Sequence, residues 1–244
     1  LVADPIFGKP GETVEIARSD DRFGVTTRSE DVTQLAFPPL PNTAEEVRGI
    51  ANLLGLPKEQ TFLGDLATEA AIKRVNRPRI LHIATHGFFS GTESTSSTEI
   101  PTDNPLLQSG LVLAGVQVGE SGSGEDGVLS ALEASSLNLL GTQLVVFSAC
   151  ETGLGDISAG EGLYGLRRAL VLAGSESQLM SLWQVQDDTT KDLMVDYYDR
   201  LLQGEGRSEA LQNAQIEMLS NEETAHPYYW APFTLSGNWD PIMF

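Results

Sequence analysis

Two residues of this chain, His86 and Cys150, could together perform nucleophilic catalysis. A thiol is only a few per cent ionised at neutral pH, and a neighbouring imidazole can accept its proton and later deliver it to a leaving group. Cys150 is the only cysteine of the chain. A lone cysteine is more often an inert buried residue than a nucleophile, so the prediction depends on its surroundings.

The residues before each candidate predict a buried strand. Residues 79–86 have an apolar centre in Ile80, Leu81, Ile83 and Ala84, and residues 143–149 are mostly apolar and lead directly into Cys150. In open parallel sheets, functional sites form outside the carboxyl ends of the strands. We therefore expect the imidazole and the thiol to meet at one edge of a sheet. Gly87 follows His86, and its backbone N–H could stabilise an oxyanion together with that of Cys150.

Strand-like runs alternate with helix-like patterns along the rest of the chain. This alternation predicts an α/β fold with a mostly parallel central sheet covered by helices. No internal repeat or long linker divides the chain, so we expect a single domain over residues 1–244. The expected helices cover residues 44–54, 68–75, 129–137, 163–173, 189–202 and 208–219, and further strands cover 1–3, 61–63, 111–114, 178–183 and 233–237.

The sequence around both candidates resembles that of the caspase-type peptidases. The motifs are Ala84-Thr85-His86-Gly87 and Ser148-Ala149-Cys150-Glu151-Thr152-Gly153. The closer match is the CHAT domain, a caspase-like domain often found behind tetratricopeptide repeats. The resemblance continues, in the order typical of that family, through residues 160–166, 181–185 and 226–231.

This resemblance implies a caspase-like α/β/α sandwich and hydrolysis of peptide bonds. His86 would be the general base and acid, and Cys150 the nucleophile. The expected partners are a protein substrate and a regulatory N-terminal repeat domain or protein partner. Loops at residues 90–105 and 117–127 are rich in glycine, serine and acidic residues, and we expect them to act as switch elements near the strand ends.

The resemblance also suggests which residues contact the substrate. The candidates are Asp4, Ser148, Ser181, Trp183 and Gln184. The pocket for the residue before the cleaved bond would include Asp4, Ser148 and Gln184, none of which is Arg or Lys. A substrate aspartate would be buried there without a partner, so we expect cleavage after basic or uncharged residues. Asp4 could instead begin a turn before Pro5, and Trp183 could instead belong to the core.

Composition excludes several classes of protein. The formal net charge is −19, which argues against nucleic-acid binding and against docking on anionic membranes. The chain contains no apolar run of about 18 residues, and its first residues lead us to expect no signal peptide. A single cysteine fits a reducing cytoplasm. The chain begins at Leu1 rather than at Met, so we expect a piece of a longer chain or a processed N-terminus.

Other polar residues are better explained as structural. His82 alternates with Leu81 and Ile83 in a predicted strand, so it should point away from their face, and His226 precedes an aromatic cluster. Three scattered histidines and one cysteine do not form a zinc site, and Gly160-Glu161-Gly162 lacks the lysine of a phosphate-binding loop. We therefore expect no metal and no cofactor.

Two other functions stay open at this point. The chain could be a catalytically silent caspase-like scaffold that binds partners without cleaving them. It could also be a hydrolase or acyltransferase that uses the same two residues on a small molecule.

Overall fold

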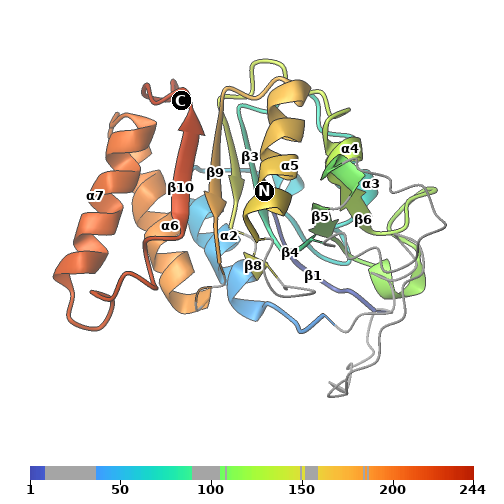
Figure 1. Cartoon of the computed structure of the whole chain (residues 1–244), viewed down its shortest axis with the longest axis horizontal. Helices are drawn as coiled ribbons and strands as arrows, with labels where there is room; N and C mark the ends of the chain where they lie inside the picture. The colour runs from blue at the N-terminus through green and yellow to red at the C-terminus, as the bar shows by residue number, and fades with distance from the viewer. Residues whose placement is uncertain are drawn as a thin grey trace, which may run out of the picture.

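The computed structural model describes residues 1–8, 37–89, 105–107, 109–148, 150–151, 159–183, 185 and 187–244. Its centre is a six-stranded sheet in the order β10-β9-β7-β3-β1-β2 (Figure 1). All neighbouring strands run parallel except β10, which is antiparallel to β9. The strands are β1 (Val2–Pro5), β2 (Phe62–Gly64), β3 (Ile80–Ala84), β7 (Leu144–Phe147), β9 (Ser177–Ser181) and β10 (Phe233–Gly237).

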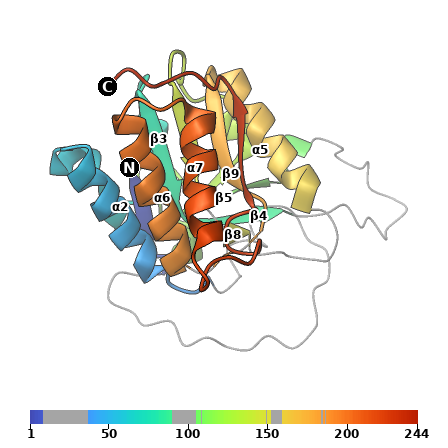
Figure 2. The same cartoon turned by 90° about the vertical axis from the view of Figure 1, so that its left-hand side faces the viewer.

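Helices cover both faces of this sheet (Figures 1 and 2). One face carries α2 (Pro41–Leu53), α6 (Asp187–Leu202) and α7 (Arg207–Ser220). The other face carries α3 (Glu69–Lys73), α4 (Ala131–Ala134) and α5 (Ala159–Ala173). The arrangement is the α/β/α sandwich that the sequence predicted. None of these helices is long and apolar enough to cross a membrane, as far as the described residues extend.

The alternation of side chains along β7 shows how the two cores form. Leu144 and Val146 pack against α6 and α7, while Val145 and Phe147 pack with Leu170 of α5. Successive side chains of a strand leave it on opposite faces, so a central strand must be apolar on both sides to be covered by helices on both sides. Burying each such side chain contributes about 1.5–3 kcal/mol.

A second, four-stranded sheet lies beyond the carboxyl ends of β3 and β7, in the order β6-β5-β4-β8. Its strands are β4 (His86–Phe89), β5 (Ser109–Val112), β6 (Val128–Ser130) and β8 (Cys150–Glu151). The prediction of one continuous strand over residues 79–86 was wrong, because the chain leaves the first sheet at Thr85 and enters the second. The Thr85 hydroxyl donates a hydrogen bond to the carbonyl oxygen of Val112 at this break.

Other elements end at residues that the sequence did not predict. Only Ala131–Ala134 are helical in the predicted helix 129–137, because Ser130 ends β6 and caps α4 in a capping box with Glu133. The strand expected to end at Trp183 ends at Ser181. Helix α5 begins at Ala159, earlier than expected.

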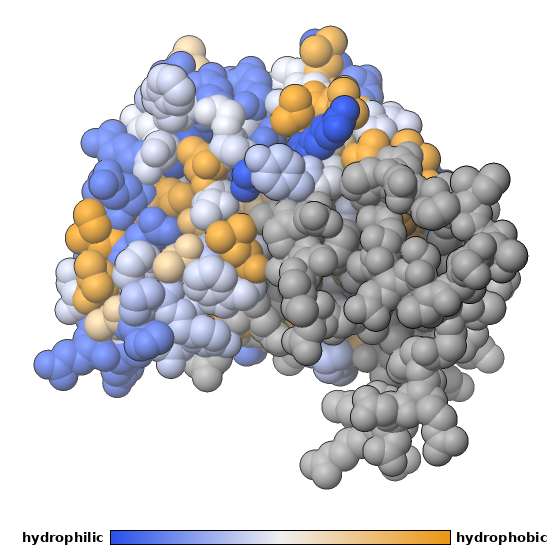
Figure 3. All heavy atoms as spheres, viewed as in Figure 1, coloured by the Kyte–Doolittle hydropathy of each residue, from blue (hydrophilic) through white to orange (hydrophobic). Residues whose placement is uncertain are grey.

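On the face that Figure 3 shows, apolar residues lie in small groups among polar ones. The most exposed apolar side chains of α5 are Tyr164, Val171 and Leu172. Scattered exposed apolar residues are normal on a folded domain.

Candidate active site

His86 is buried at the start of β4 and is held by a backbone carbonyl. Its Nε2 lies 2.8 Å from the carbonyl oxygen of Pro38. A carbonyl oxygen only accepts hydrogen bonds, so this contact requires the proton on Nε2 and leaves Nδ1 as the basic nitrogen. Nδ1 is buried and has no hydrogen-bond partner among the described residues. Phe7 and Phe37 pack beside the ring, with centroids 5.3 and 5.7 Å away.

Burial lowers the pKa of the His86 imidazole, and the hydrogen bond to Pro38 opposes this shift without cancelling it. The charged form loses hydration in the apolar surroundings, so the neutral ring is favoured at neutral pH. A neutral imidazole with an unpartnered nitrogen is the form that can accept a proton.

The backbone of Cys150 lies beside that of His86. Strands β4 and β8 run parallel, and His86 is in register with Cys150, as Gly87 is with Glu151. Neighbouring strands of a sheet lie about 4.8 Å apart. The sequence placed these two residues at the ends of neighbouring strands, and the structure pairs them within the second sheet. Gly87 is half-buried in the interior of β4.

Asp4 lies at the end of β1, next to the strand that leads to His86. Ala3 is in register with Ala84 of β3, and the register becomes irregular between Ala3 and Pro5. Asp4 has a φ of 48°, in the left-handed region that favours glycine. Such strain costs about 1–3 kcal/mol and is concentrated at functional sites. The surrounding chain maintains it, since the Asp4 N–H donates to Thr43 Oγ1 across 3.0 Å.

The carboxyl group of Asp4 is partly shielded from water. Burial raises its pKa, and the nearby Arg48 acts in the opposite direction. A carboxylate with incomplete hydration can bind a cationic group more strongly than a fully hydrated one.

The other predicted substrate-binding residues lie in different surroundings. The Ser181 hydroxyl donates to the carbonyl oxygen of Trp183 across 2.7 Å. Trp183 is 38% exposed, and its indole N–H donates to the carbonyl oxygen of Tyr228. It is therefore a surface residue and not part of the core. Ser148 is buried, with its hydroxyl 3.4 Å from His82 Nε2. Gln184 lies outside the described residues.

The two loops expected to act as switches differ in what can be described. Residues 90–104 lie outside the described residues. The loop over residues 117–127 is fixed to α3, because Glu69 accepts a hydrogen bond from the Gly127 N–H and donates one from its own N–H to Ser121 Oγ. Both distances are 2.9 Å.

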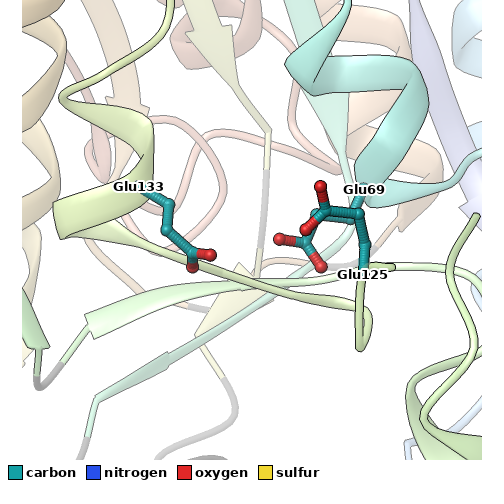
Figure 4. A group of neighbouring side chains, drawn as sticks. All are labelled: Glu69, Glu125 and Glu133. Carbon is teal, nitrogen blue, oxygen red and sulfur yellow. The ribbon is translucent and has the colours of Figure 1, made fainter. Parts of the chain in front are cut away.

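Three carboxylates, those of Glu69, Glu125 and Glu133, converge between α3, this loop and α4 (Figure 4). One oxygen from each lies within 4.8 Å of the others. The ammonium group of Lys73 lies 2.7, 2.5 and 2.9 Å from the three carboxylates, respectively, so the group already contains a cation. Burial raises the pKa of Glu69 to about 7, against the opposing hydrogen bond from Lys73. We therefore interpret this group as an ion-pair cluster that stabilises the fold. The sequence analysis missed it because its members are far apart in the chain.

Sequence reasoning also missed Pro38 and the surroundings of His82. His82 does point away from Leu81 and Ile83, as predicted, and lies in a buried polar group with Glu46 of α2. The only signal for Pro38 was the proline-rich segment that precedes α2. His226 accepts a hydrogen bond from the Tyr228 N–H at its Nδ1, which fits the predicted structural role.

Comparison with known proteins gives two findings. A family model described as CHAT domain matches residues 6–238. The chain is also similar to the mouse and human proteins named Tetratricopeptide repeat protein 28, with 27% identity over 215 residues and 28% over 216. Each match covers 82% of this chain but only 9% and 8% of the mouse and human proteins, respectively.

Proposed function

Because this chain belongs to the CHAT domain family of the caspase-like peptidase clan, we propose that it is a cysteine endopeptidase domain that cleaves selected protein partners. The observation that carries the proposal is the parallel in-register pairing of His86 with Cys150. The unpartnered, buried Nδ1 of His86 supports it further.

The reaction would proceed in two steps through an acyl-enzyme. Nδ1 of His86 takes the thiol proton, and the thiolate attacks the carbonyl carbon of the scissile bond. The backbone N–H of Cys150 stabilises the resulting oxyanion, contributing about 10²–10³ in rate. Gly87, the second donor expected from the sequence, is paired within β4 with both neighbouring strands. The imidazolium then gives its proton to the leaving amine as the carbon–nitrogen bond breaks. Water, deprotonated by the same imidazole, hydrolyses the thioester and restores the thiol.

Pro38 has a positioning role in this mechanism. Its carbonyl oxygen accepts the Nε2–H of His86, which fixes the tautomer and the orientation of the ring. It also stabilises the positive charge that the ring carries between the two proton transfers.

For the residue before the cleaved bond, we propose a preference for basic or uncharged side chains. Asp4 would supply negative charge, and Ser148 and Gln184 carry none. An aspartate in such a pocket would be buried without a cationic partner, at a cost of several kcal/mol. The net charge of −19 adds a weak long-range attraction for basic substrates.

The proposed partners follow from the relatives. The name of these relatives refers to tetratricopeptide repeats, which supports regulation of this domain by a repeat domain or by a protein partner. We propose that the domain acts in the cytoplasm, where a single cysteine stays reduced.

A cleavage-site profile tests the proposal. Purified protein is incubated with a proteome-derived peptide library, and new N-termini are identified by mass spectrometry, with Cys150→Ala as the matched control. An endopeptidase yields a defined set of internal cleavages that the variant does not produce. No cleavage in any library, together with retained binding of a partner, would instead identify a silent scaffold.

A further inference from the structure

A buried polar group lies on β3, four residues before His86, and the proposed mechanism does not use it. His82 Nε2 is 2.9 Å from Glu46 Oε1 of α2, and His82 Nδ1 is 3.1 Å from the hydroxyl of Tyr198 of α6. The Ser148 hydroxyl lies 3.4 Å from the same Nε2. Each of these four residues is at most 3% exposed.

Burying this polar group costs free energy of folding. It lies between the sheet and helices α2 and α6, where the surrounding residues Ile50, Val146 and Met194 are apolar. A buried carboxylate next to an imidazole loses hydration that their mutual attraction only partly replaces, and apolar residues of the same volume are often as stable or more so. A gain in the stability of the folded protein therefore does not explain why these polar residues are buried. A role in fixing the positions of neighbouring side chains and backbone does explain it.

The hydrogen of each partner can be assigned from chemistry. Burial raises the pKa of the Tyr198 hydroxyl well above its ordinary value, so this group keeps its proton and can donate it to His82 Nδ1. Nε2 then carries the ring proton and directs it towards the Ser148 hydroxyl, while Glu46 Oε1 lies 2.9 Å from the same nitrogen and has no hydrogen-bond partner among the described residues. The ring is held from both sides and cannot rotate freely.

Ser148 connects this group to Cys150. It follows β7, and its backbone N–H donates to the carbonyl oxygen of Ile83 across 3.2 Å, which extends the pairing of β3 with β7 by one residue. Cys150 then begins β8 two residues later. Contacts that fix Ser148 therefore fix the point at which the chain leaves the first sheet for the second.

The segment over residues 37–53 contacts His86 directly and Ser148 through His82. Pro38 binds His86 directly. Glu46, which lies on α2 within the same segment, contacts His82. His82 in turn contacts Ser148. One helix and the residues before it thus set the position of the imidazole and of the backbone before the thiol.

We propose that Glu46 and His82 are positioning residues for the dyad: they hold Ser148, and through it the backbone that leads to Cys150, which pairs with His86. The inference rests on the proposed function, because it assigns a role within that site. Neither residue touches substrate, and both act through Ser148.

The chemical reactivity of Cys150 tests the inference without any substrate. The chain has no other cysteine, so alkylation by iodoacetamide reports on this thiol alone. The rate is measured as a function of pH for the wild type, Glu46→Gln, His82→Gln, Ser148→Ala and His86→Ala. Proteolytic kcat and KM are measured in parallel.

A matched control lies at the other end of β7. Arg207 of α7 is buried and donates to the carbonyl oxygen of Gln143, just before β7, and to Ser177 Oγ at the start of β9. Arg207→Gln disturbs a buried polar group of similar kind, far from Ser148 along β7. It should lower the thermal stability and leave the pH profile of alkylation unchanged.

We expect Glu46→Gln, His82→Gln and Ser148→Ala to raise the apparent pKa of the thiol and to lower kcat about 10- to 100-fold. KM should change little in Glu46→Gln and His82→Gln, because these two residues lie outside the proposed substrate pocket. If these variants are folded and show the alkylation profile and kcat of the wild type, Glu46 and His82 have no positioning role. The proposed dyad of His86 and Cys150 would not be affected by that result. If His86→Ala also leaves the pH profile of alkylation unchanged, both the proposed dyad and the positioning role are contradicted. Should Glu46→Gln fail to fold, the alkylation profile of Ser148→Ala tests the positioning role instead, because this substitution removes only a single hydroxyl group.

Discussion

The imidazole of His86 donates its Nε2–H to the carbonyl oxygen of Pro38, a residue 48 positions earlier in the chain. The contact leaves Nδ1 unprotonated and without a hydrogen-bond partner among the described residues. It determines which nitrogen of His86 can act as a base.

The first prediction concerns the titration of this ring. In Cys150→Ala, which removes the thiol, His86 should titrate below about 6.5, since burial lowers its pKa. NMR can measure this, because the chain has only two other histidines, His82 and His226. The stability that the neutral ring contributes is present above the pKa of the unfolded chain and is lost as pH falls through the folded pKa. A measured pKa above 6.5 in this variant would contradict the assignment.

The second prediction concerns the carboxylate group around Lys73. Lys73→Met leaves Glu69, Glu125 and Glu133 without their cation and should lower the free energy of unfolding by about 3–5 kcal/mol above pH 7. Since the pKa of Glu69 is about 7 rather than 4.5, the folded state holds a proton that the unfolded state does not between these values. The loss should therefore shrink as pH falls towards 4.5.

The control for this prediction is Lys191→Met. Lys191 lies on the surface of α6, 3.7 Å from Glu45 and 3.9 Å from Asp192. Surface pairs of this kind contribute at most about 1 kcal/mol. Urea unfolding of both variants at two pH values provides the comparison, and equal losses in the two would show that the pairing of Lys73 with the buried Glu69 has no special role.

The third prediction separates the backbone strain at Asp4 from its charge. Asp4→Gly should raise the free energy of unfolding by about 1 kcal/mol, because glycine adopts a φ of 48° without strain. Asp4→Asn tolerates the same backbone and removes only the charge. Both variants should lose the preference for basic residues in a positional scanning library. A flat response to charge in the wild type, or a strong preference for aspartate, would remove the role proposed for Asp4.

The sequence predicted the parts of this fold that depend on local patterns. The apolar runs of β3 and β7 and the alternation that turns His82 away from Ile83 are visible in the order of side chains. The break at Thr85 is not, because it depends on pairing with β5, whose residues lie more than 20 positions away. His86 and Cys150 could be named from the sequence because each follows an apolar run that predicts a buried strand.

The contacts around the candidate site could not be predicted in this way. Pro38 and Glu46 reach His86 and His82 only because α2 and the residues before it pack on the face of the sheet that also carries α6. Nothing in the spacing of these residues indicates the contacts. The same holds for Glu69, Glu125 and Glu133, which three separate segments bring around one lysine.

The most direct measurement of the central claim is a double-mutant comparison of peptide cleavage. Activity is measured for the wild type, Cys150→Ala, His86→Ala and the double variant, each shown to be folded. We expect each single variant to lose nearly all of kcat/KM and the double variant to lose no more, because neither half of the dyad works alone. Cleavage at the wild-type level in either single variant would contradict the dyad.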